Sequence, residues 1–380
     1  MEKILCITND FGPRAGGIET FVIGLIERLP RSRVIVYTSA QDNSESYDRK
    51  WLEDFGVEVI RDKAKILLPT PGVAFCINAL VRERNISTAF FGAAAPLGLL
   101  SRSLRKAGVK HIVALTHGHE VWWSKVWPFT MAMKFISRNV NHLTYLGDYT
   151  RNAIAQSMSV ENATKMVKIA PGIDTEHFSP RDAHQLREEL NLAEKKVIVS
   201  VGRLVHRKGQ DVLIEAMPTI LKEVPHAHLV MIGEGPYRSY LENRVKSLGI
   251  QESVTFIGRI QYSDLPRYIC VGDVFVMPSR SRLAGLEVEG LGIVYLEASA
   301  CGLPVIAGNS GGAPDAVLEG ETGLVVDGTK KEAVAASTVE LLLDPQRSKA
   351  MGVRGREWII QEWRWDIWSA RFAELLKVNQ

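Results

Sequence analysis

Residues 289–308, EGLGIVYLEASACGLPVIAG, contain a loop, a helix and a strand in direct succession. Gly290 and Gly292 free the backbone at the start of the stretch. Residues 293–300 are expected to form a helix, and GLPVIA that follows has the short apolar run of a buried strand. A helix that leads at once into a buried strand indicates an α/β protein.

The same alternation extends outward along the chain in both directions. Apolar runs such as KILCIT, RVIVYT, HIVALTHG, KVIVSVGR and HLVMIGEG alternate with helical stretches such as residues 18–29. Strands alternating with helices predict parallel sheets covered on both faces. The stretch KIAPGIDTEHFSPRDA interrupts the series, so we expect two doubly wound domains with a hinge near residues 171–183. Their ligand site is expected in a cleft between them, at the carboxyl ends of the strands.

Composition excludes several classes of protein. A chain of 380 residues with 46% apolar and 23% charged residues suits two globular domains, and a net charge of +3 does not indicate nucleic acid binding. No run approaches the roughly 18 apolar residues of a membrane span, and the start, MEKILCITND, is too quickly polar for a signal peptide. Four widely spaced cysteines predict reduced core thiols and a cytoplasmic protein: Cys6, Cys76, Cys270 and Cys301.

Two loops between a strand and a helix carry candidate phosphate-binding groups. In GPRAGGIETFV, Gly16 and Gly17 leave backbone amides unshielded at a helix N-terminus, which suits a phosphate, although a tight turn would look the same. In VGRLVHRKGQD, Arg203, Arg207 and Lys208 can neutralise a diphosphate. A solvated basic loop is the alternative for this second stretch.

The stretch ALTHGHEVWW places two histidines just after a predicted strand of the first domain. His117 and His119 form an H-x-H pair, but no third ligand with zinc-like spacing is nearby, so we expect no metal. One functional histidine at the edge of the cleft is the favoured interpretation, and a structural role for each ring is the alternative.

The next stretch, residues 122–138, interleaves tryptophan, phenylalanine and methionine with three cations. Aromatic residues beside Lys and Arg are typical of a membrane interface, so an anionic membrane surface is an expected partner. A buried amphipathic helix of the first domain is the alternative interpretation.

Glu289 and Glu297 are the acidic residues of the opening stretch. If the whole stretch were helical, eight residues would separate them by roughly 12 Å. A glycosidase that forms a covalent intermediate needs carboxylates about 5 Å apart, so this spacing favours binding of two polyol groups of one extended ligand.

Taken together, these motifs resemble the retaining glycosyltransferases of family four, which have the GT-B fold of two facing Rossmann-like domains. The resemblance rests on Gly16-Gly17, His117, R-x4-K, E-x7-E and the stretches APGIDTEHFSP and GETGLVVDG, and it covers nearly the whole chain. Within that family, THGHE, FGAAAPL and RKGQD look most like phosphatidylinositol mannosyltransferases of the PimB type, which use GDP-mannose.

The resemblance implies a role for each charged candidate. His117 would lie beside the transferred sugar, and Arg203 and Lys208 would hold the diphosphate. Glu289 would bind the sugar and Glu297 the ribose. The donor would be a co-substrate, with no cofactor and no metal.

Main-chain groups complete the implied donor site. Gly16, and with it Gly17, would meet the phosphate from the opposite domain. Backbone amides near the sugar and phosphates would come from Leu291, Gly292, Ile293 and Val294. The base would be bound by main-chain groups around Gly258, Arg259 and Ile260.

The sequence therefore predicts a retaining, metal-independent hexosyltransferase that moves an α-mannosyl group from GDP-mannose to a lipid-linked or polyol acceptor. Residues 1–175 would form the acceptor domain, residues 176–362 the donor domain, and residues 363–380 a C-terminal helix packed on the first domain. The protein would be cytoplasmic and peripheral at the inner membrane face. A UDP-sugar transferase with a soluble acceptor, and a non-catalytic nucleotide-sugar-binding protein, stay open as alternatives, and the oligomeric state is not predicted.

Overall fold

The computed structural model describes residues 2–14 and 16–378, which divide into two compact units. Unit 1 comprises the chain up to Gly172 and again from Trp365, and unit 2 comprises Ile173–Arg364. The boundaries after residues 175 and 362 stay predictions of the sequence. The first and last residues of unit 2 contact each other. The backbone N–H of Ile173 donates to the Trp363 carbonyl at 2.7 Å, and Ile173 forms a β-bridge with Arg364.

Unit 1 is built on a seven-stranded parallel sheet with the order β3-β2-β1-β4-β5-β6-β7. Its first, second and fourth strands are buried along their whole length, which explains their continuous apolar runs. The strands are β1 (Ile4–Thr8), β2 (Val34–Thr38), β3 (Glu58–Arg61), β4 (Thr88–Phe91), β5 (His111–Ala114), β6 (His142–Tyr145) and β7 (Met166–Lys168).

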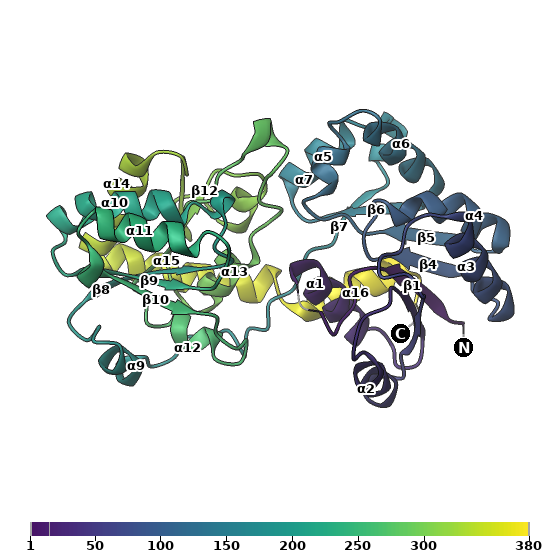
Figure 1. The fold of residues 1–380 in the computed structure, drawn as a ribbon, viewed down its shortest axis with the longest axis horizontal. Coiled ribbons are helices and arrows are strands. Elements are labelled where there is room, and N and C mark those ends of the chain that lie inside the picture. Colours follow the sequence, from purple (N-terminus) through teal and green to yellow (C-terminus); the bar gives the residue numbers. More distant parts are fainter. Residues whose placement is uncertain (1, 15, 379–380) are drawn as a thin grey trace. The chain divides into compact units, whose positions relative to one another are not determined.

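Helices cover both faces of this sheet (Figure 1). They are α1 (Gly17–Glu27), α2 (Glu45–Phe55), α3 (Pro71–Glu83), η1 (Leu97–Leu100), α4 (Ser101–Ala107), α5 (Glu120–Trp123), α6 (Phe129–Asn139), α7 (Asp148–Ala155), α8 (Val160–Ala163) and α16 (Trp365–Leu375). Local sequence sets their ends. The Thr70 hydroxyl caps α3 by accepting from the Val73 N–H, and Gly56 ends α2 in the left-handed conformation.

Unit 2 is built on a six-stranded parallel sheet with the order β10-β9-β8-β11-β12-β13. The strands are β8 (Lys196–Val201), β9 (Ala227–Ile232), β10 (Val254–Gly258), β11 (Val274–Met277), β12 (Val305–Gly308) and β13 (Gly323–Val326). The helices are α9 (His184–Glu189), η2 (His206–Lys208), α10 (Gln210–Glu223), α11 (Arg238–Ser247), η3 (Gln251–Ser253), α12 (Leu265–Ile269), η4 (Leu283–Gly285), α13 (Ile293–Ala300), η5 (Ala313–Ala316), α14 (Lys331–Leu343) and α15 (Pro345–Glu362).

Helix α16 belongs to unit 1 although it follows unit 2 in the sequence. It packs beside α1, as the yellow and purple ribbons of Figure 1 show. The Phe372 ring meets Phe90 of β4 edge to face at 5.2 Å, and the Trp365 ring lies 6.4 Å from Phe21 of α1. The Leu375 carbonyl oxygen lies 2.8 Å from His111 Nε2. Helix α16 is therefore part of the core of unit 1.

Both sheets have the strand order of a doubly wound Rossmann domain, 3-2-1-4-5-6, with one extra strand in unit 1. The prediction of two doubly wound domains is confirmed. In each sheet the order reverses next to the first strand, between β1 and β4 and between β8 and β11. Ligands of such sheets bind at the carboxyl ends of the strands at this reversal, so the loops that follow these strands are where the functional groups are sought.

Two further expectations concern thiols and membranes. Cys6 and Cys301 are buried, but Cys76 is exposed on α3, so the expectation of core thiols is wrong for Cys76. The helix α3 exposes this residue because its apolar face, with Val73, Ile77 and Leu80, is the one turned to the core.

Within residues 2–14 and 16–378, every helix is too short or too polar to cross a membrane.

Candidate functional site

In unit 2, the loops after β8 and β11 bring a lysine and a glutamate into contact at the carboxyl edge of the sheet. Lys208 Nζ lies 2.8 Å from Glu289 Oε2, and both side chains are almost fully buried. Arg207 Nε is 3.9 Å from the same oxygen. A buried ion pair of this kind is costly to break, and an incoming anion offers Lys208 an alternative partner.

A glycine makes the approach of these two loops possible. Gly209 follows Lys208 in the left-handed conformation, with φ of 72°, and a Cβ at this position would lie 1.9 Å from the Pro278 carbonyl oxygen. The Arg280 N–H donates to the Arg207 carbonyl at 2.8 Å. The backbone after β8 is thus clamped against the backbone after β11.

The loop after β12 fixes Glu289 from the other side. The Glu289 N–H donates to Ser310 Oγ at 3.2 Å, and the Gly312 N–H donates to the Glu289 carbonyl at 2.8 Å. A Cβ on Gly311 would lie 2.3 Å from that same carbonyl oxygen. Three residues in the stretch NSGGAPD therefore position the glutamate, a role that was not predicted from the sequence.

Helix α13 begins at Ile293, four residues after Glu289, and ends at Ala300, where the sequence predicts. Gly292 caps its N-terminus with φ of 81°, and the leading amide groups, from Leu291 through Ile293 and Val294, belong to the end of a helix that attracts anions. Because Glu289 precedes the helix, the separation of 12 Å estimated for a helical stretch does not apply. The short loop between Glu289 and the helix changes the path of the chain.

Glu297 lies inside α13 and is buried. Burial raises its pKa from the ordinary value of 4.5 to about 7, and the positive charge of Lys208 works in the opposite direction. Both glutamates of the opening stretch therefore interact with Lys208. A carboxyl group has two oxygens that can each accept a hydrogen bond, which suits the two hydroxyls of a diol.

The remaining candidates of unit 2 lie in the loop after β8, at the end of β10 and in the loop after β10. Arg203 is an exposed residue of the loop after β8, and its carbonyl accepts from Gln210 Nε2 at 3.3 Å. Gly258 ends β10, which is separated from β8 by β9. Arg259 is exposed and Ile260 is half-buried in the loop that follows.

A second buried ion pair beside the loop after β8 was not predicted from the sequence. Arg280 Nη2 donates to Asp211 Oδ2 at 2.7 Å and to His206 Nδ1 at 2.7 Å. The Tyr237 hydroxyl donates to the same aspartate oxygen at 3.2 Å. The stretches HRKGQD and PSRSR contain the charged residues, but only the fold shows that they meet.

In unit 1, Gly16 and Gly17 lie where predicted, at the N-terminus of α1. Gly16 is the N-cap residue in an extended conformation. A Cβ on it would lie 2.2 Å from Glu19 Oε2, and Arg14 Nε donates to Glu19 Oε1 at 2.9 Å. A carboxylate therefore lies against this helix N-terminus, where the sequence predicts a phosphate.

His117 follows β5 and is buried. Its Nε2 lies 2.7 Å from the Gly92 carbonyl oxygen, and its backbone N–H donates to Glu120 Oε2 at 2.7 Å. Burial lowers the pKa of the His117 ring, which favours the neutral imidazole. The His119 ring stacks against it with centroids 6.1 Å apart, and His119 Nε2 lies 3.2 Å from Glu120 Oε1.

Acidic side chains surround these groups, and none of them was a candidate from the sequence. Burial, with the neighbouring charge of Glu19, raises the pKa of Asp10 from 3.8 to about 6, and His119 and Arg14 oppose that shift. Asp10 lies two residues after the first strand, in the stretch ITND. Its position at the ligand-binding edge of the sheet could have identified it from the sequence. The edge of unit 1 is thus rich in carboxylates that suit hydroxyl groups better than phosphates.

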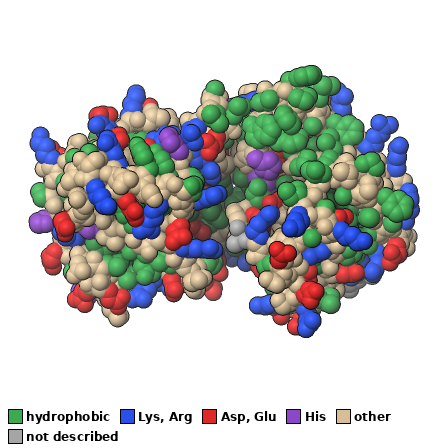
Figure 2. All heavy atoms as spheres, viewed as in Figure 1, with side chains coloured by type: hydrophobic (Ala, Val, Ile, Leu, Met, Phe, Trp, Pro, Cys, Tyr) green, Lys and Arg blue, Asp and Glu red, His purple; other side chains and the backbone are tan. Residues whose placement is uncertain are grey.

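The aromatic stretch after His119 forms α5, a turn and α6. Trp122, Trp123 and Phe129 pack together with ring centroids 4.6–5.5 Å apart, and Trp123 also contacts the core of unit 1. Trp127 and Met131 remain 76% and 61% exposed. Figure 2 shows hydrophobic side chains gathered over α5 and α6. Part of this stretch is core and part is an exposed apolar surface.

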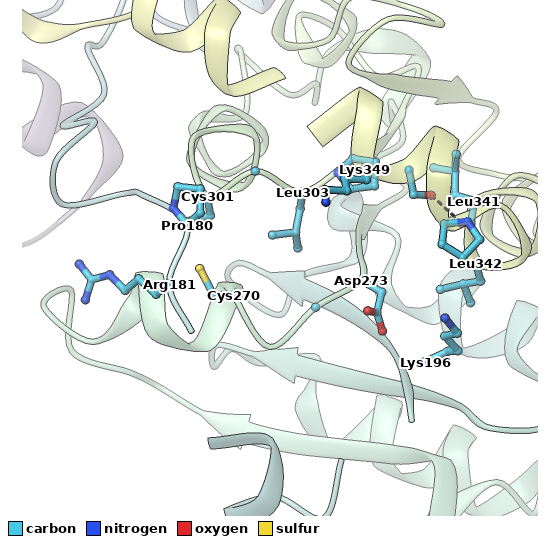
Figure 3. Close-up of a pocket in the computed structure, with 15 residues that line it drawn as sticks. Pro180, Arg181, Lys196, Cys270, Asp273, Cys301, Leu303, Leu341, Leu342 and Lys349 are labelled. Atoms are coloured by element: carbon cyan, nitrogen blue, oxygen red, sulfur yellow. Dashed lines mark hydrogen bonds between the residues drawn. The ribbon is translucent and has the colours of Figure 1, made fainter. Parts of the chain in front are cut away.

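A cavity of about 290 Å³ in unit 2 lies at the opposite end of the strands (Figure 3). Its lining includes Lys196 at the start of β8, Asp273 just before β11 and Leu303 shortly before β12. These are the amino ends of the strands, so the cavity is separate from the Lys208 cluster. Among the residues that the structure describes, no group of three or more His, Cys, Asp or Glu side chains is arranged to hold a metal ion.

Comparison with known proteins gives consistent matches over both units. Residues 182–358 match the profile of "Glycosyl transferases group 1", and residues 15–177 match that of "Glycosyltransferase Family 4". The chain is 44% identical over 376 residues to a GDP-mannose-dependent alpha-(1-6)-phosphatidylinositol monomannoside mannosyltransferase of Mycolicibacterium smegmatis, with 98% of each chain covered.

A second relative and a solved structure extend these matches. The chain is 39% identical over 383 residues to a GDP-mannose-dependent monoacylated alpha-(1-6)-phosphatidylinositol monomannoside mannosyltransferase of Corynebacterium glutamicum, covering 99% of this chain and 98% of the other. It superimposes on Anabaena HepE in complex with UDP with a TM-score of 0.82 at 19% identity, covering 99% and 100% of the two chains. The predicted GT-B fold class is confirmed.

Proposed function

Because the chain belongs to the family of group 1 and family 4 glycosyltransferases, we propose that it transfers an α-mannosyl group from GDP-mannose to a phosphatidylinositol mannoside. The observation that carries the proposal is the identity of 44% over 98% of both chains with an enzyme of that printed activity. The buried cluster around Lys208 supplies charges that suit such a donor.

Unit 2 would bind the donor at the carboxyl ends of β8 and β11. Lys208 and Arg203 would neutralise the diphosphate of the donor. The backbone amides at the N-terminus of α13 would donate hydrogen bonds to it. Glu289, released from its contact of 2.8 Å with Lys208, would accept hydrogen bonds from sugar hydroxyls. Glu297 would bind the ribose diol, and main-chain groups around Gly258 would face the base.

Transfer would proceed with retention of configuration. The acceptor hydroxyl would attack on the face from which the diphosphate departs, and a departing phosphate oxygen would take up the hydroxyl proton. The positive charges of Lys208 and Arg203 would stabilise the negative charge that develops on the diphosphate. His117 would lie beside the transferred sugar as a neutral hydrogen-bonding group, since burial lowers its pKa.

Unit 1 would bind the acceptor. Asp10, Glu19 and Glu120 gather at the carboxyl edge of its sheet, and carboxylates of this kind are good acceptors for the hydroxyls of inositol and mannose. All four cysteines are free thiols, which supports a reducing compartment and action from the cytoplasmic face of the membrane.

The test is transfer of labelled mannose from GDP-mannose to phosphatidylinositol monomannoside, with Lys208→Met and the matched variant Lys222→Met. Lys222 is an exposed lysine in the last turn of α10. We expect Lys208→Met to lower turnover by at least about 100-fold, since it removes charge stabilisation of the transition state, and Lys222→Met to match wild type. Stabilisation by UDP but not by GDP, with no mannosyl transfer, would overturn the proposed donor.

A further inference from the structure

The exposed side chains of α6 form a stripe that changes from apolar to cationic along the helix. Met131, Lys134 and Arg138 lie at spacings of three and four residues, which places them on one helix face. Met133 and Ile136 are buried on the opposite face. Trp127, four residues before Met131, is 76% exposed and extends the apolar end. A stripe that is graded in polarity suits an interface between oil and water.

The cationic end of this stripe lines a hollow. A cavity of about 210 Å³ is bounded by Lys134, Ser137 and Arg138 on α6 and by Met158, Ser159 and Asn162 on the segment that leads into and forms α8. Val160, which follows Ser159 in the sequence, is 85% exposed. The lining of the hollow therefore combines cations and hydrogen-bonding side chains with the apolar Met158.

Lys134 and Arg138 are the two cations that line this hollow. In the described ranges, neither the Lys134 nor the Arg138 side chain forms an ion pair with a carboxylate. Lys165 adds a third positive charge next to the hollow, since its Nζ donates to Asn162 Oδ1 at 2.7 Å. Glu161 is a nearby carboxylate, but its side chain is not part of the lining. An anion could thus be met by two cations at once.

We propose that this hollow binds the phosphodiester head group of an anionic phospholipid while Trp127 and Met131 enter the acyl region beside it. The proposal rests on the proposed function, because an enzyme that glycosylates a lipid must approach a bilayer. The helix rises by about 10 Å from Met131 to Arg138, so its apolar end is separated from its cationic end. The apolar surface over α5 and α6 in Figure 2 would then contact the membrane.

The first experiment measures co-sedimentation with vesicles of phosphatidylcholine, with and without phosphatidylglycerol. The double variant Lys134→Gln/Arg138→Gln should bind the anionic vesicles about 30-fold more weakly than wild type, from the attraction expected of two cations near the surface. The matched control is Arg102→Gln/Lys106→Gln. These are two cations, also four residues apart, on α4 of the same unit. Equal losses in both double variants would mean diffuse attraction and would overturn the site.

A second pair of measurements separates a lipid head group from free phosphate. Trp127→Ser/Met131→Ser should lose vesicle binding while keeping the two cations, and inorganic phosphate should fail to displace wild type from vesicles at matched ionic strength. Displacement by inorganic phosphate, with normal vesicle binding by Trp127→Ser/Met131→Ser, would make the hollow a site for free anions and overturn the lipid assignment.

Activity on a water-soluble mannosyl acceptor distinguishes failure of this site from failure of the proposed function. All three double variants should transfer mannose to that acceptor at the wild-type rate. This result would also show that they are folded. If Lys134→Gln/Arg138→Gln keeps wild-type activity and also binds vesicles as wild type does, the lipid site is refuted and the proposed function still holds. Binding that depends on the two cations, without any use of GDP-mannose, would refute the function and leave the site.

Discussion

At the scale of single residues, the spacings R-x4-K and E-x7-E identified charged groups of which two meet in the structure. Lys208 contacts Glu289 at 2.8 Å and lies close enough to affect the pKa of Glu297. What the spacing could not reveal is the environment of each group. Burial of Glu297, and the carboxylate of Glu19 at the helix N-terminus beside Gly16, depend on how the chain packs in three dimensions.

Burial of Glu297 predicts a pH dependence of stability. Its pKa is about 7 in the folded state and near 4.5 in the unfolded state, so the folded protein binds the proton more tightly. The free energy of unfolding should fall by up to roughly 3 kcal/mol as pH rises from about 4 to 8. In Glu297→Gln this component of the fall should be absent.

Urea unfolding at several pH values between these limits checks that expectation. Glu332→Gln, at an exposed glutamate of α14, should retain the wild-type dependence. A Glu297→Gln profile parallel to that of wild type would show that the carboxyl is not protonated in the folded protein.

At the scale of elements, the alternation of apolar runs and helical stretches predicted the two sheets and also the bounds of α13. Local pattern suffices there, because each strand buried on both faces needs a continuous apolar run. It does not suffice where loops meet. The path from Glu289 into α13 and the contact of Gly311 with the Glu289 backbone come from packing between separate β–α loops.

Gly209 shows how closely two such loops approach, and its substitution should be costly. Gly209→Ala combines a left-handed backbone with a Cβ 1.9 Å from the Pro278 carbonyl oxygen. Gly249 has nearly the same φ, 69°, but a Cβ there would meet nothing within 4 Å, so Gly249→Ala isolates the backbone strain. We expect Gly249→Ala to cost about 1 kcal/mol.

Gly209→Ala should cost more and should also weaken GDP binding by at least about tenfold, because the clash displaces the loop that carries Lys208. Denaturant unfolding and titration calorimetry measure the two effects. Equal stability losses and unchanged nucleotide affinity in the two variants would show that the close approach of these loops is unimportant.

At the scale of the whole molecule, the division into two Rossmann units follows from the sequence. Tertiary contacts determine that unit 1 also includes the segment that follows unit 2 in the sequence. Helix α16 was expected on the first domain, and the structure places Phe372 fully buried against Phe90 of β4. Aromatic content alone marks this helix as packed. Only the fold shows that Phe372 of this helix contacts Phe90.

Phe372→Ala should therefore destabilise unit 1 by about 3–5 kcal/mol, the usual effect of removing a buried phenylalanine ring. Phe75→Ala, at a phenylalanine of α3 that is 75% exposed, should change stability by no more than about 0.5 kcal/mol. Amide hydrogen exchange locates the effect. Protection should fall in strands β1 and β4 and persist in β8 and β9, and equal loss in both sheets would contradict independent units.

The shared chain has a consequence for the order in which the protein is made. Unit 2 is a single stretch, Ile173–Arg364, so all of its strands have been synthesised before α16. The strands of unit 1 emerge first, but this unit lacks Trp365 and Phe372 until the whole of unit 2 has been translated. The later-synthesised half can therefore complete its core earlier. During that interval the nascent first half exposes the apolar surface of α1 and β4 that α16 later covers, where chaperones could bind.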